Sequence, residues 1–188
     1  MSLFKKVSEN TLYLTVGLPR SGKSTWAEST GWPIVNRDSI RYAIGGTIRY
    51  FEAEDKVNEI ERVMIKALFC AGHKKVIVDA THLKQKYIDG WDKFATLLWT
   101  PYRNDREPKD RNFEIELVKF HTAMDVCMQR AREDFPEDTK FPSIIKSMWA
   151  SAETIEIPEV GLYIDTKKKR EEKLNQTLGY MRLIKGDL

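Results

Sequence analysis

The most informative stretch of the chain reads Gly17-Leu18-Pro19-Arg20-Ser21-Gly22-Lys23-Ser24. It fits the phosphate-binding pattern G-x-x-x-x-G-K-[ST] at every fixed position. The two glycines allow backbone N–H groups to turn inward around phosphate oxygens, where side chains would block the approach. We therefore predict that this stretch, together with Thr25 after it, binds the phosphates of a nucleotide.

The residues on either side fit such a phosphate cradle. Thr11–Val16 is a short apolar and β-branched run that ends at the first glycine, which predicts a buried strand. Residues 23–29 can begin a helix, whose positive dipole end would face the same anion. In this pattern Lys23 reaches the β- and γ-phosphates, and the Ser24 hydroxyl ligates Mg²⁺. The predicted cofactors are ATP and Mg²⁺.

Strands and helices alternate along the rest of the chain. The hydrophobic pattern predicts strands over residues 33–36, 75–79 and 113–120, and helices over residues 52–71, 84–98, 124–133 and 142–152. In the longest helix, the apolar residues expected on one face are Val57, Ile60, Val63, Met64, Ala67 and Leu68. The alternation predicts an α/β fold: the three-layer sandwich of P-loop NTPases, with a mostly parallel sheet and a helical lid.

Composition and charge suit a globular protein. The chain has 41% hydrophobic and 31% charged residues and a net charge of +3, and we expect a single domain over residues 1–188. Nothing approaches the roughly 20 continuous apolar residues of a membrane span. Cys70 and Cys127 are expected as reduced, half-buried thiols of a cytoplasmic protein, in the host cytoplasm if a phage encodes it. Residues 166–188 are expected to form a solvated tail.

The turn after the second predicted strand carries a candidate catalytic base. Asp38 lies there, and in an open α/β sheet ligands gather beyond the carboxyl ends of the strands. Asp38 can accept a proton from an attacking hydroxyl, and Arg41, one helical turn on, can hold a substrate phosphate. The alternative is that Asp38 only caps a helix.

A second acid, Asp79, ends the strand predicted over residues 75–79. A carboxylate at the end of a buried strand beside the cradle strand is the usual place for a group that acts on Mg²⁺ or its waters. Asp79 is therefore a candidate for metal and substrate binding. Thr81 and His82 follow it and are candidates for substrate contact, the alternative for His82 being an incidental loop histidine.

A basic helix then leads into a polar loop that contains Pro136. We predict a lid over residues 130–142, from which Arg130 or Arg132 stabilises charge on the transferring phosphoryl group. The alternative is an ordinary amphipathic helix with solvated arginines.

With these groups in this order, the chain resembles the kinase domain of phage polynucleotide kinase and its compact phage and bacterial relatives. The matching residues are Gly17–Ala27, Val35–Asp38, Val76–Leu83 and Arg130 with Arg132. The resemblance implies ATP-dependent transfer of phosphate to the 5′-hydroxyl of a nucleic acid, more plausibly DNA than RNA. It also implies that Asp38 activates the hydroxyl, that Arg41 contacts acceptor phosphate, and that a lid arginine contacts the donor phosphates.

The chain departs from that family in two places. The phage enzyme has its strand-end acid immediately before its threonine, whereas this chain has Ala80 there and carries Asp79 one residue earlier. The lid contains acids such as Glu133 and Asp134, where the phage enzyme is more basic. The resemblance therefore leaves the roles of Asp79 and of the lid arginines open.

Other functions stay open beside a 5′-hydroxyl kinase. Related compact phage kinases phosphorylate the hydroxymethyl group of a modified pyrimidine in DNA, such as 5-hydroxymethyluracil, by the same chemistry. A kinase of a small metabolite or nucleoside would need a closed acceptor pocket, and a nucleotide-dependent switch would need no base such as Asp38. Arg49, with Tyr50 and Phe51 after it, is expected to shape the acceptor pocket, where these side chains can stack on a nucleobase.

Overall fold

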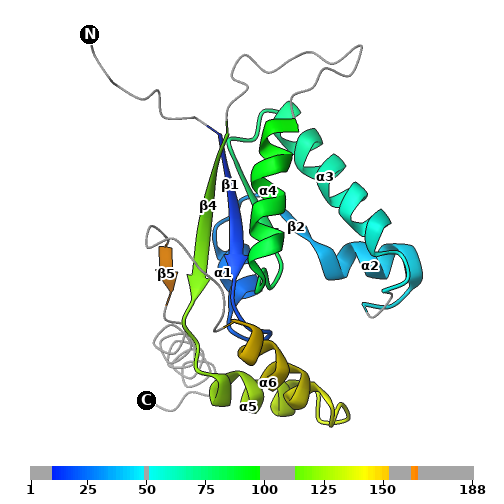
Figure 1. Ribbon diagram of the computed structural model, residues 1–188, viewed down its shortest axis with the longest axis vertical. Helices are drawn as coiled ribbons and strands as arrows, with labels where there is room; N and C mark the ends of the chain where they lie inside the picture. Colours follow the sequence, from blue (N-terminus) through cyan, green and yellow to red (C-terminus); the bar gives the residue numbers. More distant parts are fainter. Residues whose placement is uncertain (1–9, 49–50, 98–112, 153–161, 165–188) are drawn as a thin grey trace, which may run out of the picture.

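The computed structural model describes residues 10–48, 51–97, 113–152 and 162–164, and within these ranges the strands form one sheet (Figure 1). The strands are β1 (Asn10–Val16), β2 (Ile34–Asn36), β3 (Lys75–Asp79), β4 (Phe113–Phe120) and β5 (Leu162–Ile164). Their order is β2-β3-β1-β4-β5, and each neighbouring pair is parallel. All carboxyl ends therefore meet at one edge of the sheet, and this confirms the predicted parallel α/β fold.

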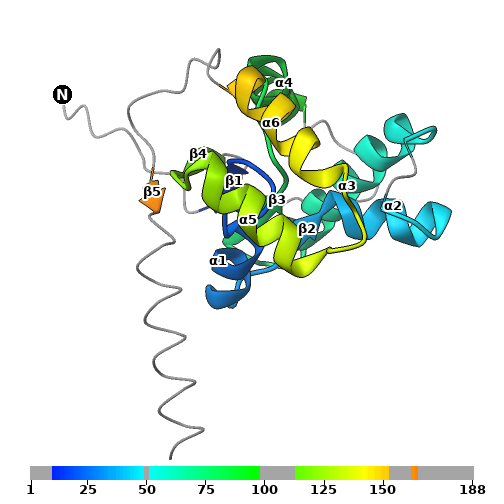
Figure 2. The same ribbon diagram turned by 90° about the horizontal axis from the view of Figure 1, so that it is seen from below.

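The described helices cover both faces and the carboxyl edge of this sheet. They are α1 (Lys23–Ser29), α2 (Arg37–Gly45), α3 (Glu54–Cys70), α4 (Gln85–Leu97), α5 (Met124–Asp134) and α6 (Phe141–Ala152). Core residues of α3 and α4 pack on one face, and Trp26 of α1 packs on the other against Tyr13 and Phe120. Figure 2 looks onto the carboxyl edge, where α5 and α6 lie in front of the strands. Strand β5 was not predicted, and for α2 we expected helical geometry around Asp38 and Arg41 without giving bounds.

The predicted buried face of α3 is wrong in part, since only Val57 is buried and Leu68 half-buried among the residues expected there. The buried residues of this helix follow a spacing of four and are Val57, Glu61, Ile65 and Phe69. Large apolar residues expected beside Val57 are instead exposed, and they are Ile60, Val63 and Met64. The reason is that Arg37 donates to Glu61 at 2.9 Å, which allows a carboxylate to occupy a position on the buried face.

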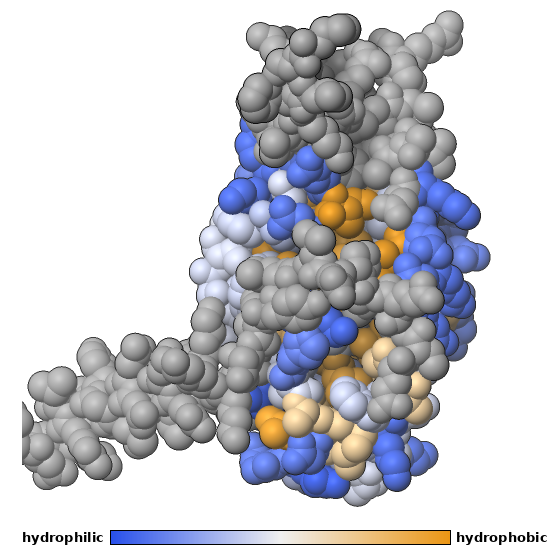
Figure 3. Space-filling model, turned by 60° about the vertical axis from the view of Figure 1, so that its left-hand side comes forward, coloured by the Kyte–Doolittle hydropathy of each residue, from blue (hydrophilic) through white to orange (hydrophobic). Residues whose placement is uncertain are grey.

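The two cysteines are not the half-buried pair that we expected. Cys70 is exposed and Cys127 is buried, and both are free thiols. No helix in the described ranges is long and apolar enough to cross a membrane. On the face shown in Figure 3, hydrophobic residues are visible with hydrophilic residues to either side. The predicted tail over residues 166–188 lies outside the described residues, as does Arg49.

Candidate functional site

The phosphate cradle is the loop between β1 and α1. A Cβ atom on Gly17 would lie 2.9 Å from the Ser21 Oγ and 3.0 Å from the Phe120 Cβ, so a side chain there would force the surrounding residues to shift. Gly22 has a φ of 99° and forms the N-cap of α1, a conformation that glycine adopts at little cost. The Gly17 N–H donates to the Thr81 carbonyl at 3.1 Å, which links the loop to the residues after β3.

Lys23 turns its ammonium group into this cradle. The side chain is buried, and its Nζ donates to the Leu18 carbonyl at 2.7 Å. Burial lowers the pKa of Lys23 to about 8, although the charges of Asp79 and Asp38 act in the opposite direction. The free protein thus holds a cation with little compensating charge, which a polyphosphate would supply.

Asp79 connects the cradle to the second strand. It is buried at the end of β3, and its Oδ2 accepts from the Ser24 hydroxyl at 2.7 Å and from the Asn36 amide at 3.0 Å. The Thr15 hydroxyl lies 3.3 Å from the other carboxylate oxygen. The hydroxyl of Ser24 and the carboxylate of Asp79 are hard oxygen donors side by side, a set that fits Mg²⁺ with the rest of its shell as water and phosphate.

Helix α2 presents Asp38 beside the cradle. Asn36 caps this helix, because its side chain accepts from the Ser39 N–H at 2.8 Å, so the capping role does not belong to Asp38. Asp38 lies in the first turn with 61% of its side chain exposed, and Arg41 donates to it at 2.5 Å. Asn36, two residues before Asp38, donates to the same Asp79 carboxylate oxygen as Ser24, so the start of α2 lies next to the cradle.

An ion-pair network joins α2 to α3. Arg41 donates through Nε to the Glu54 Oε1 at 2.5 Å, and Arg37 donates to the Glu54 Oε2 at 2.8 Å. The hydrogen bond from Arg41 is the main cause that lowers the pKa of Glu54, and burial raises the pKa of Glu61 to about 7. Arg37 therefore faces α3, whereas Arg41 bridges Glu54 and Asp38.

The structure does not place His82 where a substrate contact was predicted. His82 is buried, and the Trp91 indole N–H donates to its Nε2 at 3.0 Å. Because Nε2 accepts, the ring proton lies on Nδ1, which donates to the Thr15 carbonyl at 2.8 Å. Burial lowers the pKa of His82 to about 4, so the ring is neutral at physiological pH. His82 thus links the end of β3 to β1, and we remove it from the candidate acceptor site.

Of the two candidate lid arginines, the structure brings only Arg130 to the cradle. Arg130 is buried and donates to the Arg20 carbonyl at 3.1 Å, whereas Arg132 is exposed. The Arg20 side chain forms an ion pair with Asp134 and lies 5.2 Å from the centroid of the Phe135 ring. The predicted lid region therefore contacts the cradle through the carboxylate of Asp134 as well as through the guanidinium of Arg130.

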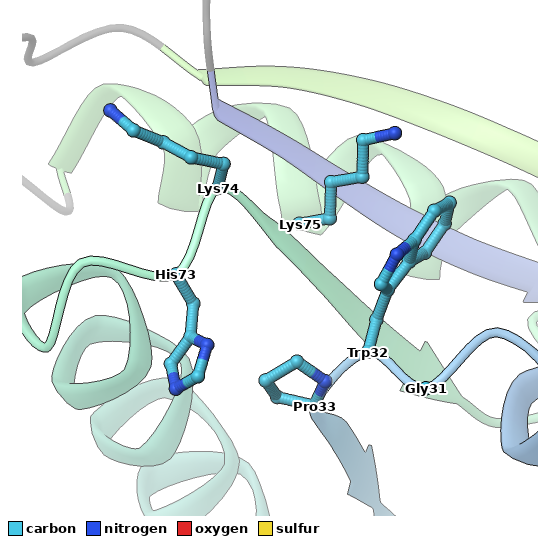
Figure 4. A pocket seen from close by; sticks show the side chains of 6 residues that line it. All are labelled: Gly31, Trp32, Pro33, His73, Lys74 and Lys75. Atoms are coloured by element: carbon cyan, nitrogen blue, oxygen red, sulfur yellow. The ribbon is translucent and has the colours of Figure 1, made fainter.

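The described structure also has an open pocket away from these residues (Figure 4). Its lining residues are Gly31, Trp32, Pro33, His73, Lys74 and Lys75. They precede or begin β2 and β3, so the pocket lies at the amino edge of the sheet, opposite the cradle. It contains none of the predicted site residues.

Three residues of the site region had no role assigned to them from the sequence: Asn36, Glu54 and Trp91. For Asn36 a signal existed, because an asparagine before a helix start is a common N-cap. Glu54 and Trp91 contact Arg41 and His82, which lie 13 and 9 residues away along the chain. No local pattern marks such pairs.

The parallel sheet, the glycine-rich cradle and the helices over the carboxyl edge define a nucleotide-binding domain with the fold of the P-loop kinases. More particularly, the chain belongs to the AAA domain family, whose model matches residues 12–133. A comparison with curated proteins found no significant match.

Solved structures share this fold. A chain of the Pnkp1/Rnl/Hen1 RNA repair complex matches with a TM-score of 0.60 and 21% identity over 81% of this chain and 47% of that one. A putative kinase from Chloroflexus aurantiacus J-10-fl has a TM-score of 0.58 and 13% identity, over 93% and 98% of the two chains. A gluconokinase from Sinorhizobium meliloti 1021 has a TM-score of 0.50 and 17% identity, over 86% and 85%. The chain spans about half the length of the RNA repair protein, and these likenesses establish the fold.

Proposed function

We propose that the chain transfers the γ-phosphate of ATP to a hydroxyl group of a nucleic acid, in the first instance the 5′-hydroxyl of DNA. The observation that carries the proposal is the position of Asp38. This carboxylate is exposed to an acceptor and accepts a hydrogen bond from Arg41. It also follows Asn36 by two residues, and Asn36 donates to Asp79 at the edge of the cradle. A nucleotide switch would need no such base on the acceptor side of the cradle.

The proposed reaction divides the work among few side chains. The proton of the acceptor hydroxyl passes to Asp38, the hydroxyl oxygen forms the new bond to the γ-phosphorus, and the bond to the bridging oxygen breaks to release ADP. Lys23 and Arg130 balance the negative charge of the phosphates, and Arg41 can bind an acceptor phosphate through its remaining N–H groups. Ser24 and Asp79 would hold Mg²⁺, which neutralises charge on the β- and γ-phosphates when bound.

Two observations favour a nucleic acid as the acceptor. The Asp38 side chain is 61% exposed, so a large substrate has access to it. A chain of an RNA repair complex is among the similar structures. A small-metabolite kinase is the competing proposal, because a gluconokinase shares the fold.

The acceptor is tested by transfer of label from γ-labelled ATP to matched substrates. These are 5′-hydroxyl DNA, 5′-hydroxyl RNA, end-blocked DNA that contains 5-hydroxymethyluracil, and free nucleosides and sugars. We expect label in 5′-hydroxyl DNA. Label only in the hydroxymethylated DNA would show that the acceptor is the hydroxymethyl group of the modified pyrimidine and not the 5′-hydroxyl. Label only in small molecules would overturn a nucleic-acid acceptor.

The role of Asp38 as the general base is tested with Asp38→Asn. We expect kcat to fall by about 100-fold or more, the usual scale for loss of a general base, while ATP affinity is kept. Asp55→Asn is the matched control, because Asp55 is also an exposed aspartate in the first turn of a helix. Near-normal turnover by Asp38→Asn would show that another group takes the proton.

A further inference from the structure

We infer that two exposed aromatic side chains beside Asp38, Tyr42 and Phe51, form a platform that binds the nucleobase of the acceptor nucleotide. This inference rests on the proposed function and deepens it. It assigns an acceptor with three chemical parts: a hydroxyl, a phosphate and a planar base.

The platform is contiguous with the proposed base. Tyr42 follows Asp38 by four residues in α2, so the two side chains lie one turn apart on the same face of the helix. On the other side, the Arg41 guanidinium lies 5.5 Å from the centroid of the Phe51 ring and donates to Asp38 at 2.5 Å. The Arg41 guanidinium thus lies between the Phe51 ring and the Asp38 carboxylate.

Both rings are open to a ligand. Tyr42 and Phe51 are each 62% exposed, and Ile44 and Ile48 between them are 39% and 50% exposed. Several exposed large apolar side chains within one short segment of the chain make that segment a candidate binding surface. Because one side of the Phe51 ring faces Arg41, a planar ligand can stack on the other side.

A nucleotide matches the chemistry of this surface part by part. Its base can stack on the aromatic rings, its phosphate can pair with Arg41, and its hydroxyl can reach Asp38. A sugar or polyol has a hydroxyl for Asp38 but no aromatic face for the rings. The platform therefore favours nucleic acid over the small polyols that other kinases of this fold phosphorylate.

The test compares Tyr42→Leu and Phe51→Leu with the wild type on two 5′-hydroxyl DNAs. One carries an ordinary first nucleotide, and the other carries a tetrahydrofuran abasic residue in its place. Loss of stacking on a base raises KM by about tenfold in each variant on ordinary DNA, with kcat largely kept. The abasic DNA has a high KM with the wild type, and neither substitution raises it further.

Tyr87→Leu is the matched control, because Tyr87 is a tyrosine on α4 with 49% exposure and no place in the proposed site. Its KM should equal that of the wild type. If the wild type phosphorylates DNA and both platform variants keep its KM, the platform is wrong and the proposed function stands. If these variants instead change the assembly state at unchanged KM, the surface is an interface between copies of the chain. A wild type with no activity on any nucleic acid would overturn the proposed function itself.

Discussion

Burial destabilises the charged form of the Lys23 side chain in the folded protein. Its ammonium is buried beneath the cradle loop, and burial lowers its pKa from 10.5 to about 8. Binding of a polyphosphate requires the charged form, so the free protein must take up a proton on binding wherever Lys23 has lost one. The affinity for nucleotide should therefore depend on pH just above neutrality.

We predict that ATP affinity is constant below pH 8 and falls as the pH rises through it, by up to about tenfold per pH unit. The sign follows because the unbound state, with its lowered pKa, loses the proton before the bound state does. Isothermal titration from pH 7 to 10 measures the effect. Lys23→Arg keeps its charge over this range and should give a flatter profile, and an equally steep profile in that variant would assign the titration to another group.

The positions of single residues were predictable from the sequence where a local pattern defines them. The pattern of the cradle predicted that Lys23 would lie in the loop region, and its Nζ contacts the Leu18 carbonyl there. The end of a buried strand predicted Asp79 near the cradle, and Asp79 lies 2.7 Å from the Ser24 hydroxyl. The orientation of His82 was not predictable, because it depends on a hydrogen bond from Trp91, nine residues away in the next helix. The local sequence around a histidine after a strand end does not show whether its side chain faces solvent or the core.

Among the elements, α2 and α3 are joined by the Glu54 carboxylate of α3, which accepts hydrogen bonds from Arg37 and Arg41 of α2. Glu54 at the start of α3 binds Arg41 through Nε and Nη2 at 2.5 and 3.2 Å. Arg41 in turn donates to Asp38, whose side chain makes no other hydrogen bond within the described residues. We infer that Glu54 is a positioning residue for the proposed base.

Glu54→Gln should lower kcat by about tenfold while ATP affinity is unchanged, because misplacement of a catalytic group costs rate rather than donor binding. Stopped-flow or steady-state kinetics with a separate ATP titration distinguish the two. Glu59→Gln is the control: Glu59 is on the same helix and pairs only with the exposed Lys56 in the described structure. A loss of ATP affinity that matches the loss of kcat would indicate general disruption in place of positioning.

Element boundaries were predictable to within two residues for most helices and strands, because their apolar runs are clear. The bounds of α2 were not predicted, because it begins at Arg37, directly after the last residue of β2, with no loop to separate them. The buried face of α3 was partly misassigned because Glu61 occupies an apolar position with the support of Arg37. The pattern of hydrophobic residues cannot include an acid whose partner lies 24 residues away.

On the scale of the whole molecule, the cradle joins two hydrophobic clusters. Val16 at the end of β1 belongs to the core under α3 and α4. Leu18, two residues later, belongs to a second cluster made with α5 and α6. The alternation of strands and helices was enough to predict the fold class, but the strand order and the packing of α5 and α6 on the cradle depend on these long-range contacts.

Because the cradle touches both clusters, nucleotide binding should stabilise the molecule as one unit. At Mg-ATP concentrations of 100 times Kd, binding adds about 2.7 kcal/mol, which raises the Tm of a chain of this size by about 5–10 °C. Scanning calorimetry of the full chain should show a single transition that shifts by this amount, with no shift in Lys23→Ala and a normal shift in Tyr87→Leu. Two transitions of which Mg-ATP moves only one would show that the clusters unfold independently, and would contradict a single domain over residues 1–188.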